Sequence, residues 1–298
     1  MIEIKKILCP TDFSDFSRRA LGHALALAKW YEAEVSVLHV IPKLLMPPDV
    51  YPYLSEPLLP DPRARESALE ELGRFVHHAR ELGIPTEVRL EEGDAVEEIL
   101  KWSEQLPAHL VVMGTHGRRG FERLVLGSVA EKVLRKATCP VMTVAKEPEG
   151  TAAALFKKIL CPIDFSASST RALEYALSLA KEGDAHLTLL HVVEAALEEA
   201  GDTAAFALSE YRHFLKRNAL ERLQSAVPKE AREWCEPEFI VASGRSYRHI
   251  LDVAEKQDTD LIVMGVQGRN AVDLALFGST AHHVVREAKC PVLTIRSQ

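Results

Sequence analysis

The sequence has few cysteines, no long apolar run and no excess of basic residues, and each shortage argues against a class of protein. Five cysteines with no Cys-x-x-Cys pair make neither a disulfide scaffold nor a zinc site. No apolar run reaches the roughly 20 residues that a membrane-spanning helix needs. The opening residues, Met1–Lys6, lead into a strand-like segment rather than a signal peptide. These absences predict a cytoplasmic protein with no membrane contact.

Charge argues against a nucleic acid as the partner. The 298 residues carry 36 Lys and Arg against 43 Asp and Glu, a net charge of −7, and both halves of the chain are acidic. A domain that binds DNA or RNA is expected to present a basic surface. The cysteines Cys9, Cys139, Cys161 and Cys290 flank short apolar runs, which predicts buried, reduced thiols.

The common catalytic and phosphate-binding signatures are also missing. The chain has no Gly-x-Gly-x-x-Gly after a first strand, no Gly-x-x-x-x-Gly-Lys-Ser/Thr loop, no Gly-x-Ser-x-Gly elbow and no His-Glu-x-x-His motif. The pairs His77-His78 and His282-His283 are neighbours in helical patterns, so their side chains do not face one site. We therefore predict no catalytic residue and no metal site of the protein's own.

The chain repeats itself. Lys6–Ser14 recurs as Lys158–Ser166, and Cys139–Val141 recurs as Cys290–Val292, with the order of motifs kept. Self-similarity over this length indicates two copies of one domain. We place the first domain at 1–147, a linker at 148–156 and the second domain at 157–298.

Each copy alternates strand-like apolar runs with helical patterns. In the first copy we expect strands at 4–9, 35–41, 86–90, 110–114 and 141–145, and helices at 17–30, 63–82, 95–105 and 128–137. In the second copy we expect strands near 159–161, 187–193, 238–241, 261–265 and 292–295, and a mostly helical segment at 194–227. Such alternation implies parallel strands, right-handed crossovers and helices on both faces. The predicted fold class is α/β, with two tandem doubly wound, five-stranded, Rossmann-like sheets.

The glycines gather after the fourth strand of each copy, at the edge where doubly wound sheets bind ligands. Both copies read strand, Gly-x-x-Gly, nine residues, Gly-Ser, helix, with the residues Gly114, Gly117, Gly127 and Ser128, and again Gly265, Gly268, Gly278 and Ser279. Glycine lets backbone amides approach an anion, and the helix start adds the positive end of its dipole. The pattern favours a phosphate site, although a turn and a helix cap alone would also explain it.

An aspartate follows the first strand of each copy, at the same edge. Asp12 and Asp164 would repel a triphosphate by roughly 1–4 kcal/mol at about 4 Å. They therefore suit the other end of a nucleotide, as acceptors for ribose hydroxyls or an adenine amino group. Capping of the next helix is the alternative. Val40 and Val192 end the second strand and either form a wall for a base or pack in the core.

These motifs resemble the ATP-binding branch of the universal stress protein family, twice and over essentially the whole chain. The residues so predicted to bind nucleotide are Pro10, Thr11, Asp12, Val40, Met113, Gly114, His116, Gly117, Arg118, Gly127, Ser128 and Val129, with Pro162, Ile163, Asp164, Val192, Met264, Gly265, Gln267, Gly268, Gly278, Ser279 and Thr280 in the second copy. The resemblance implies strand order 3-2-1-4-5, adenine near Asp12 and Val40, and phosphates on Gly117, Gly127 and Ser128. It also implies that the two last strands pair, so that the domains form a pseudo-dimer.

The two copies are not equal. Gln267 replaces His116, and the arginines Arg118, Arg119 and Arg123 of the first copy are matched in the second by Arg269 alone. A glutamine cannot become cationic, and fewer arginines lower the local positive potential. We expect weaker or different nucleotide binding in the second domain.

The predicted function is an ATP-binding stress-response regulator that binds an unknown protein partner. The nucleotide (ATP, with or without Mg²⁺, or else AMP or ADP) would set the conformation of the proline-rich loop at 42–62 and so the partner contacts. Two alternatives remain open, namely a slow ATPase or nucleotidyl-transfer enzyme and a scaffold that no longer uses nucleotide. A homodimer of the two-domain chain is also compatible with the sequence.

Overall fold

The computed structural model describes residues 2–43, 62–117, 126–145, 156–193, 205–267 and 277–297. Two residues predicted to bind nucleotide, Arg118 and Gly268, lie outside these ranges. The same is true of 44–61 in the predicted loop and of 146–155 around the predicted linker.

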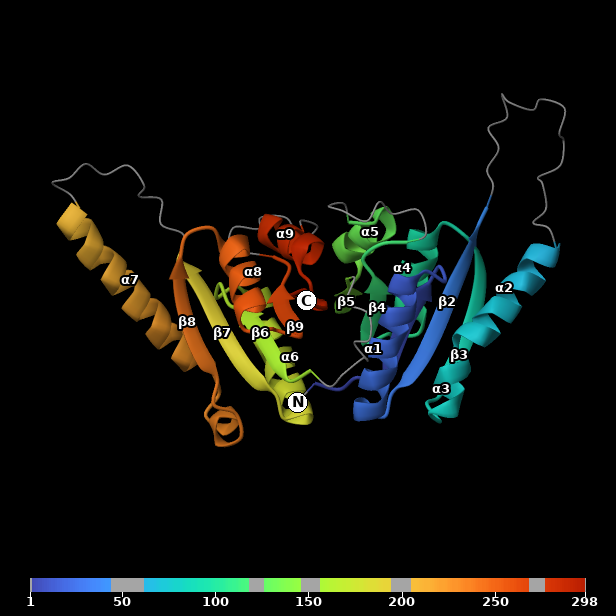
Figure 1. Ribbon diagram of the computed structural model, residues 1–298, viewed down its shortest axis with the longest axis horizontal. Helices are drawn as coiled ribbons and strands as arrows, with labels where there is room; N and C mark the ends of the chain where they lie inside the picture. Colours follow the sequence, from blue (N-terminus) through green and yellow to red (C-terminus); the bar gives the residue numbers. More distant parts are fainter. Residues whose placement is uncertain are drawn as a thin grey trace, which may run out of the picture.

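A single ten-stranded sheet runs through both domains (Figure 1). Its order is β3-β2-β1-β4-β5-β10-β9-β6-β7-β8. The strands are β1 (Lys6–Thr11), β2 (Glu34–Pro42), β3 (Thr86–Gly93), β4 (Leu110–Gly114), β5 (Val141–Val144), β6 (Lys158–Pro162), β7 (His186–Val193), β8 (Glu238–Ser243), β9 (Leu261–Gly265) and β10 (Val292–Ile295). Neighbours are parallel except for the antiparallel pair β5 and β10. The predicted order 3-2-1-4-5 is therefore confirmed in each domain.

Helices cover both faces of the sheet, as the β-α-β alternation predicts. One face carries α1 (Asp15–Tyr31), α2 (Pro62–Phe75), α3 (His77–Glu81), α6 (Ala167–Gly183) and α7 (Ala205–Ala226). The other face carries α4 (Ala95–Gln105), α5 (Ser128–Lys136), α8 (Ser246–Lys256) and α9 (Ser279–Glu287). A short 3₁₀ turn, η2 (Glu230–Glu233), follows α7. A hydrophobic core lies on each face of the sheet, and alternate residues of a strand pack into one or the other. Ile7 and Cys9 of β1 face the first set of helices, and Leu8 faces the second.

The bounds of several expected elements differ from the structure; the third strand, for example, runs to Gly93 and not to 90. The helix expected at 63–82 is broken at Val76, whose φ of −94° and ψ of 6° interrupt it between α2 and α3. Leu72, Val76 and Ala79 are all fully buried and keep helical spacing across the break, so α2 and α3 turn the same face to one core. The first strand, expected to end at Cys9, continues to Thr11, because β1 keeps pairing with β2 as far as Thr11 beside His39.

The domains join through β5 and β10, as the predicted pseudo-dimer requires. Met142 and Leu293 face each other in the antiparallel register, with 0% and 1% of their surface exposed. On either side, Thr143 Oγ1 donates to the carbonyl of Val292 at 3.3 Å, and Thr294 Oγ1 donates to that of Val141 at 2.8 Å. The pairing covers what would otherwise be two exposed apolar edges.

None of the five cysteines, all of them in the described ranges, forms a disulfide, and they are not equally buried. Cys9 and Cys161 are fully buried, and burial raises the pKa of Cys9 to about 12 and that of Cys161 further. Cys139 and Cys290 are half-buried, so the expectation of a buried thiol is wrong in degree for these two. No helix in the described ranges is long and apolar enough to cross a bilayer.

Candidate functional site

The strand order reverses between β1 and β4, and the two strands part there. Their pairing stops at Leu8 beside Val111, whereas β1 stays paired with β2 to its end. In the second domain the pairing of β6 with β9 likewise stops at Leu160 beside Ile262. In each domain the carboxyl ends of the first and fourth strands are therefore not paired with each other; we call this switch point the opening, because ligands of doubly wound sheets bind at such places.

Asp12 lies at this opening and is held by a tight turn. Its Oδ1 accepts hydrogen bonds from the amide of Ser14 at 3.1 Å and from the hydroxyl of Ser14 at 2.6 Å. Ser14 in turn caps α1, and the intervening Phe13 has a φ of +64°, a left-handed conformation that is uncommon for a bulky residue. The Phe13 ring lies against the ring of His39, with 4.4 Å between centroids. Asp12 thus supports the cap of α1 through Ser14 and is not itself the capping residue.

The second oxygen of Asp12 faces the glycine loop. A Cβ atom on Gly117 would lie 2.6 Å from Asp12 Oδ2. Gly117 belongs to the loop after β4, so the structure brings together two residues that are 105 positions apart in the chain. A side chain at 117 would collide with the aspartate, so this close approach of the loop requires glycine.

The start of α5 lies behind the same loop. The amide of Gly127 donates to the carbonyl of Thr115 at 2.8 Å, which ties the helix start to the end of β4. Gly127 is the N-cap residue, and no described side chain caps this end, in contrast to α1, α4 and α6, which are capped by Ser14, Asp94 and Ser166. The amides of an uncapped first turn are donors for an anion, supported by the helix dipole. Ser128, the first helical residue, is exposed.

His116 adds a buried nitrogen beside this loop. Its Nδ1 lies 2.9 Å from Thr115 Oγ1, which itself donates to the carbonyl of Val144 at 3.3 Å. This chain of hydrogen bonds favours a proton on Nδ1 and leaves Nε2 as an acceptor. Among the described residues, buried Nε2 has no hydrogen-bond partner, an arrangement that costs about 1–3 kcal/mol when nothing satisfies it.

The second domain has the same turn but a different loop. Asp164 Oδ1 accepts from the amide and hydroxyl of Ser166, at 3.0 and 2.6 Å. Gln267, which replaces His116, is 6% exposed and accepts from Ser297 Oγ at 2.8 Å. Its backbone carbonyl accepts from Ser168 Oγ at 2.5 Å. Gln267, at the position of His116, therefore already accepts hydrogen bonds from the hydroxyls of Ser297 and Ser168.

The other predicted residues fall into two groups. Near the openings lie Gly114 and Val129 and, in the second domain, Gly265, Gly278, Ser279 and Thr280, with Val40 and Val192 half-buried at the strand ends. In the strands or just beyond them, Pro10, Thr11, Met113, Ile163 and Met264 are buried, and Pro162 is half-buried. The Thr11 hydroxyl is engaged by Ser17 Oγ and the amide of Phe13, each at 3.0 Å. Side chains of the buried set support the site rather than line it.

Sequence reasoning missed Phe13 and Ser14, although the repeat carried their signal. Asp-Phe-Ser occurs in both copies, and Phe165 repeats the left-handed φ at +63°. The turn fixes the aspartate, and His39 Nδ1 ties β2 to the carbonyl of Thr11 at 2.8 Å. In the second domain His191 Nδ1 contacts the carbonyl of Ile163 at 2.6 Å in the same way.

Gly127→Ala should lower the free energy of unfolding by about 1–3 kcal/mol, because the new Cβ would lie 2.8 Å from the carbonyl oxygen of Thr115. Gly73→Ala in α2 is the matched control. A Cβ there meets nothing within 4 Å, so the change should raise the free energy of unfolding by roughly 0.5–1 kcal/mol. Urea denaturation measures both. Equal effects would contradict the close packing at Gly127.

The fold and the two openings define the chain as a tandem, doubly wound α/β protein with a candidate anion site after β4 of the first domain. The model of the universal stress protein family matches residues 3–145 and 155–296. The chain therefore belongs to the universal stress protein family, with one domain of that family in each half.

Known relatives agree with this assignment. A universal stress protein of Methanocaldococcus jannaschii is 39% identical over 147 residues, which are 48% of this chain and 82% of the relative. One of Mycolicibacterium smegmatis is 24% identical over 303 residues and covers 97% of this chain and 96% of its own. The crystal structure of a universal stress protein from Archaeoglobus fulgidus superposes with a TM-score of 0.69 at 29% identity, over 99% of both chains. The tandem arrangement thus recurs in relatives that match this chain over nearly its whole length.

Proposed function

We propose that the first domain binds ATP in the opening between β1 and β4. The observation that carries this proposal is the close approach of Asp12 Oδ2 to Gly117 across that opening, with the uncapped start of α5 beyond the loop. A carboxylate can accept hydrogen bonds from the two hydroxyls of a ribose, and an uncapped helix start can hold phosphate. The two ends of the site thus match the two ends of a nucleotide.

In the proposed pose the adenosine lies at Asp12 and Val40, and the phosphates lie at Gly117, Gly127 and Ser128. This orientation directs the ribose to the carboxylate and the outer phosphates to the start of α5, so only a phosphate at Gly117 would lie close to Asp12. His116 Nε2, buried without a partner among the described residues, would gain one from a ligand hydroxyl. Any Mg²⁺ would be held chiefly by the phosphates themselves, since no cluster of three His, Cys, Asp or Glu side chains occurs in the described ranges.

The second domain is proposed to bind nucleotide less tightly. Gln267 is already hydrogen-bonded to Ser297, and Ser168 occupies the position of Phe16. A ligand there would have to compete with these internal hydrogen bonds. Asp164, Val192, Gly278 and Ser279 would form the weaker site.

We propose a regulatory role in the stress response, with at most slow hydrolysis of ATP, in which the bound nucleotide controls the binding of a protein partner. The test of the ligand is to denature the purified chain and to identify released nucleotide by chromatography and mass. ATP, ADP or AMP in the supernatant is the expected result. A chain that carries no nucleotide, and whose melting temperature does not change with added ATP, would overturn the proposal.

A further inference from the structure

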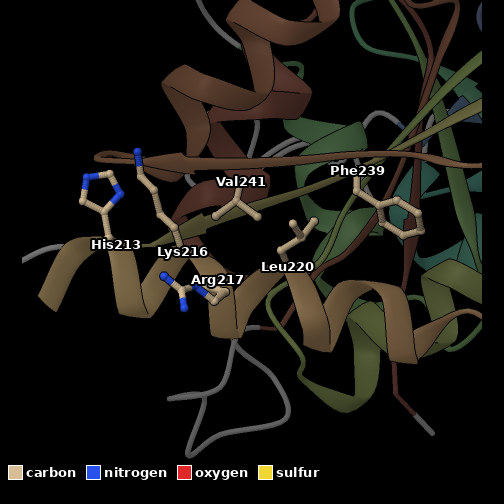
Figure 2. A pocket seen from close by; sticks show the side chains of 6 residues that line it. All are labelled: His213, Lys216, Arg217, Leu220, Phe239 and Val241. Carbon is tan, nitrogen blue, oxygen red and sulfur yellow. The ribbon is translucent and has the colours of Figure 1, made fainter. Parts of the chain in front are cut away.

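A groove lies between α7 and β8 at the outer end of the sheet, away from the junction of the domains (Figure 1). Its volume is about 380 Å³, within the range of small-molecule sites. It is lined by His213, Lys216, Arg217 and Leu220 of α7 and by Phe239 and Val241 of β8. Figure 2 shows Lys216 and Leu220 extending from the helix toward the strand that carries Val241 and Phe239, and Arg217 lying along the helix.

The inner wall of the groove is apolar. Phe239 and Val241 are two residues apart, so they project from the same face of β8, and both are half-buried against the core under α7. Leu220 faces them, and Leu223, one turn further along the helix, is fully buried. The groove is therefore the place where this core opens to solvent. None of the six lining side chains carries a hydroxyl or a carboxylate, so a polar ligand tail would lose hydrogen bonds there.

The rim of the groove is cationic. Lys216 and Arg217 are exposed, and His213 lies one turn before them on the same helix. Within the described part of the chain, none of the three side chains takes part in an ion pair or a hydrogen bond. Positive charge beside an apolar wall is complementary to an anion with an apolar tail.

The first domain shows what is missing from the second. There β3 is the equivalent of β8, and Glu92 pairs with Arg65 of α2 at 3.2 Å. Glu92 lies beside Ile41 of β2, and the corresponding residue beside Val193 of β7 is Ser243. At this position the outer strand thus has a carboxylate in the first domain and a hydroxyl in the second.

We propose that the α7–β8 groove binds a small amphipathic anion, a carboxylate with an aliphatic tail, whose head group takes the role that Glu92 plays in the first domain. Lys216 and Arg217 bind the head group, and Leu220, Phe239 and Val241 contact the tail. The site is separate from the nucleotide openings, and the proposal does not depend on ATP binding.

Decanoate is the probe, with decanol as its uncharged counterpart. Calorimetry of the full chain should show saturable binding of decanoate, with decanol about tenfold weaker because it lacks the charge that Lys216 and Arg217 bind. The double variant K216Q/R217Q should weaken decanoate about tenfold. Ser243→Glu, which restores a carboxylate at the position of Glu92, should weaken it to a similar extent.

Lys256→Gln on α8, an exposed cation on the opposite face of the sheet, is the matched control and should leave decanoate binding unchanged. Unchanged urea midpoints would show that the variants are folded. Absence of saturable binding would overturn the proposal, as would equal affinity for decanol and decanoate, or wild-type affinity in K216Q/R217Q. Displacement of decanoate by ATP would contradict the separate location.

Discussion

Asp12→Asn is expected to weaken ATP binding about 10- to 100-fold, because a hydrogen bond to a charged group contributes roughly 1.5–3 kcal/mol. The substitution is chosen for what it keeps. An asparagine retains one oxygen that can accept from Ser14, so the turn around Phe13 and the cap of α1 can survive. It removes the charge and the second acceptor, which is the oxygen that faces Gly117.

The matched control for this prediction is built into the repeat. Asp164→Asn makes the same change in the same turn of the second domain, where Ser166 takes the place of Ser14. Titration calorimetry should show that this variant keeps the affinity of the tighter site within about twofold. If Asp12→Asn bound ATP as tightly as the wild type, the role of Asp12 would be purely that of a cap.

Leu293→Ala should lower the free energy of unfolding by about 2–5 kcal/mol, the range for a large-to-small change in a packed core. Leu293 is 1% exposed and faces Met142 at the only antiparallel pairing among the described strands, so the cavity forms in the core shared by both domains. The substitution should therefore weaken the junction as well as the second domain.

Leu69→Ala provides the control, because Leu69 on α2 is 46% exposed. This substitution should change the free energy of unfolding by no more than about 0.5 kcal/mol. Urea denaturation of the two variants measures the difference. Equal and small losses would mean that the two domains do not share a core at β5 and β10.

Much of the fold follows from the sequence because the repeat doubles every signal. The apolar runs at 110–114 and 261–265 coincide with β4 and β9. They could be predicted because a strand covered on both faces needs apolar residues at every position. The break at Val76 does not follow from periodicity, because helical spacing continues through it. The buried residues Leu72, Val76 and Ala79 keep one helical face on both sides of it, so their pattern carries no sign of the break.

The site was predictable in outline but not in its contacts. Spacing places Asp12 and Gly117 at one edge of the sheet, but their direct approach depends on the left-handed φ of Phe13, which no propensity predicts. The α7–β8 groove lay outside sequence reasoning altogether. Helical patterning indicates that α7 packs on the sheet. It does not show that Lys216 and Arg217 line a groove with Phe239 and Val241, or that none of the described lining side chains is a carboxylate.

The central claim is that the first domain binds ATP and the second does so less well. Calorimetric titration of ATP into the nucleotide-free chain tests it most directly, because it counts sites as well as measuring affinity. The account predicts one tight site per chain, with any second site clearly weaker and unaffected by Asp12→Asn. No binding, or two sites of equal affinity, would contradict it.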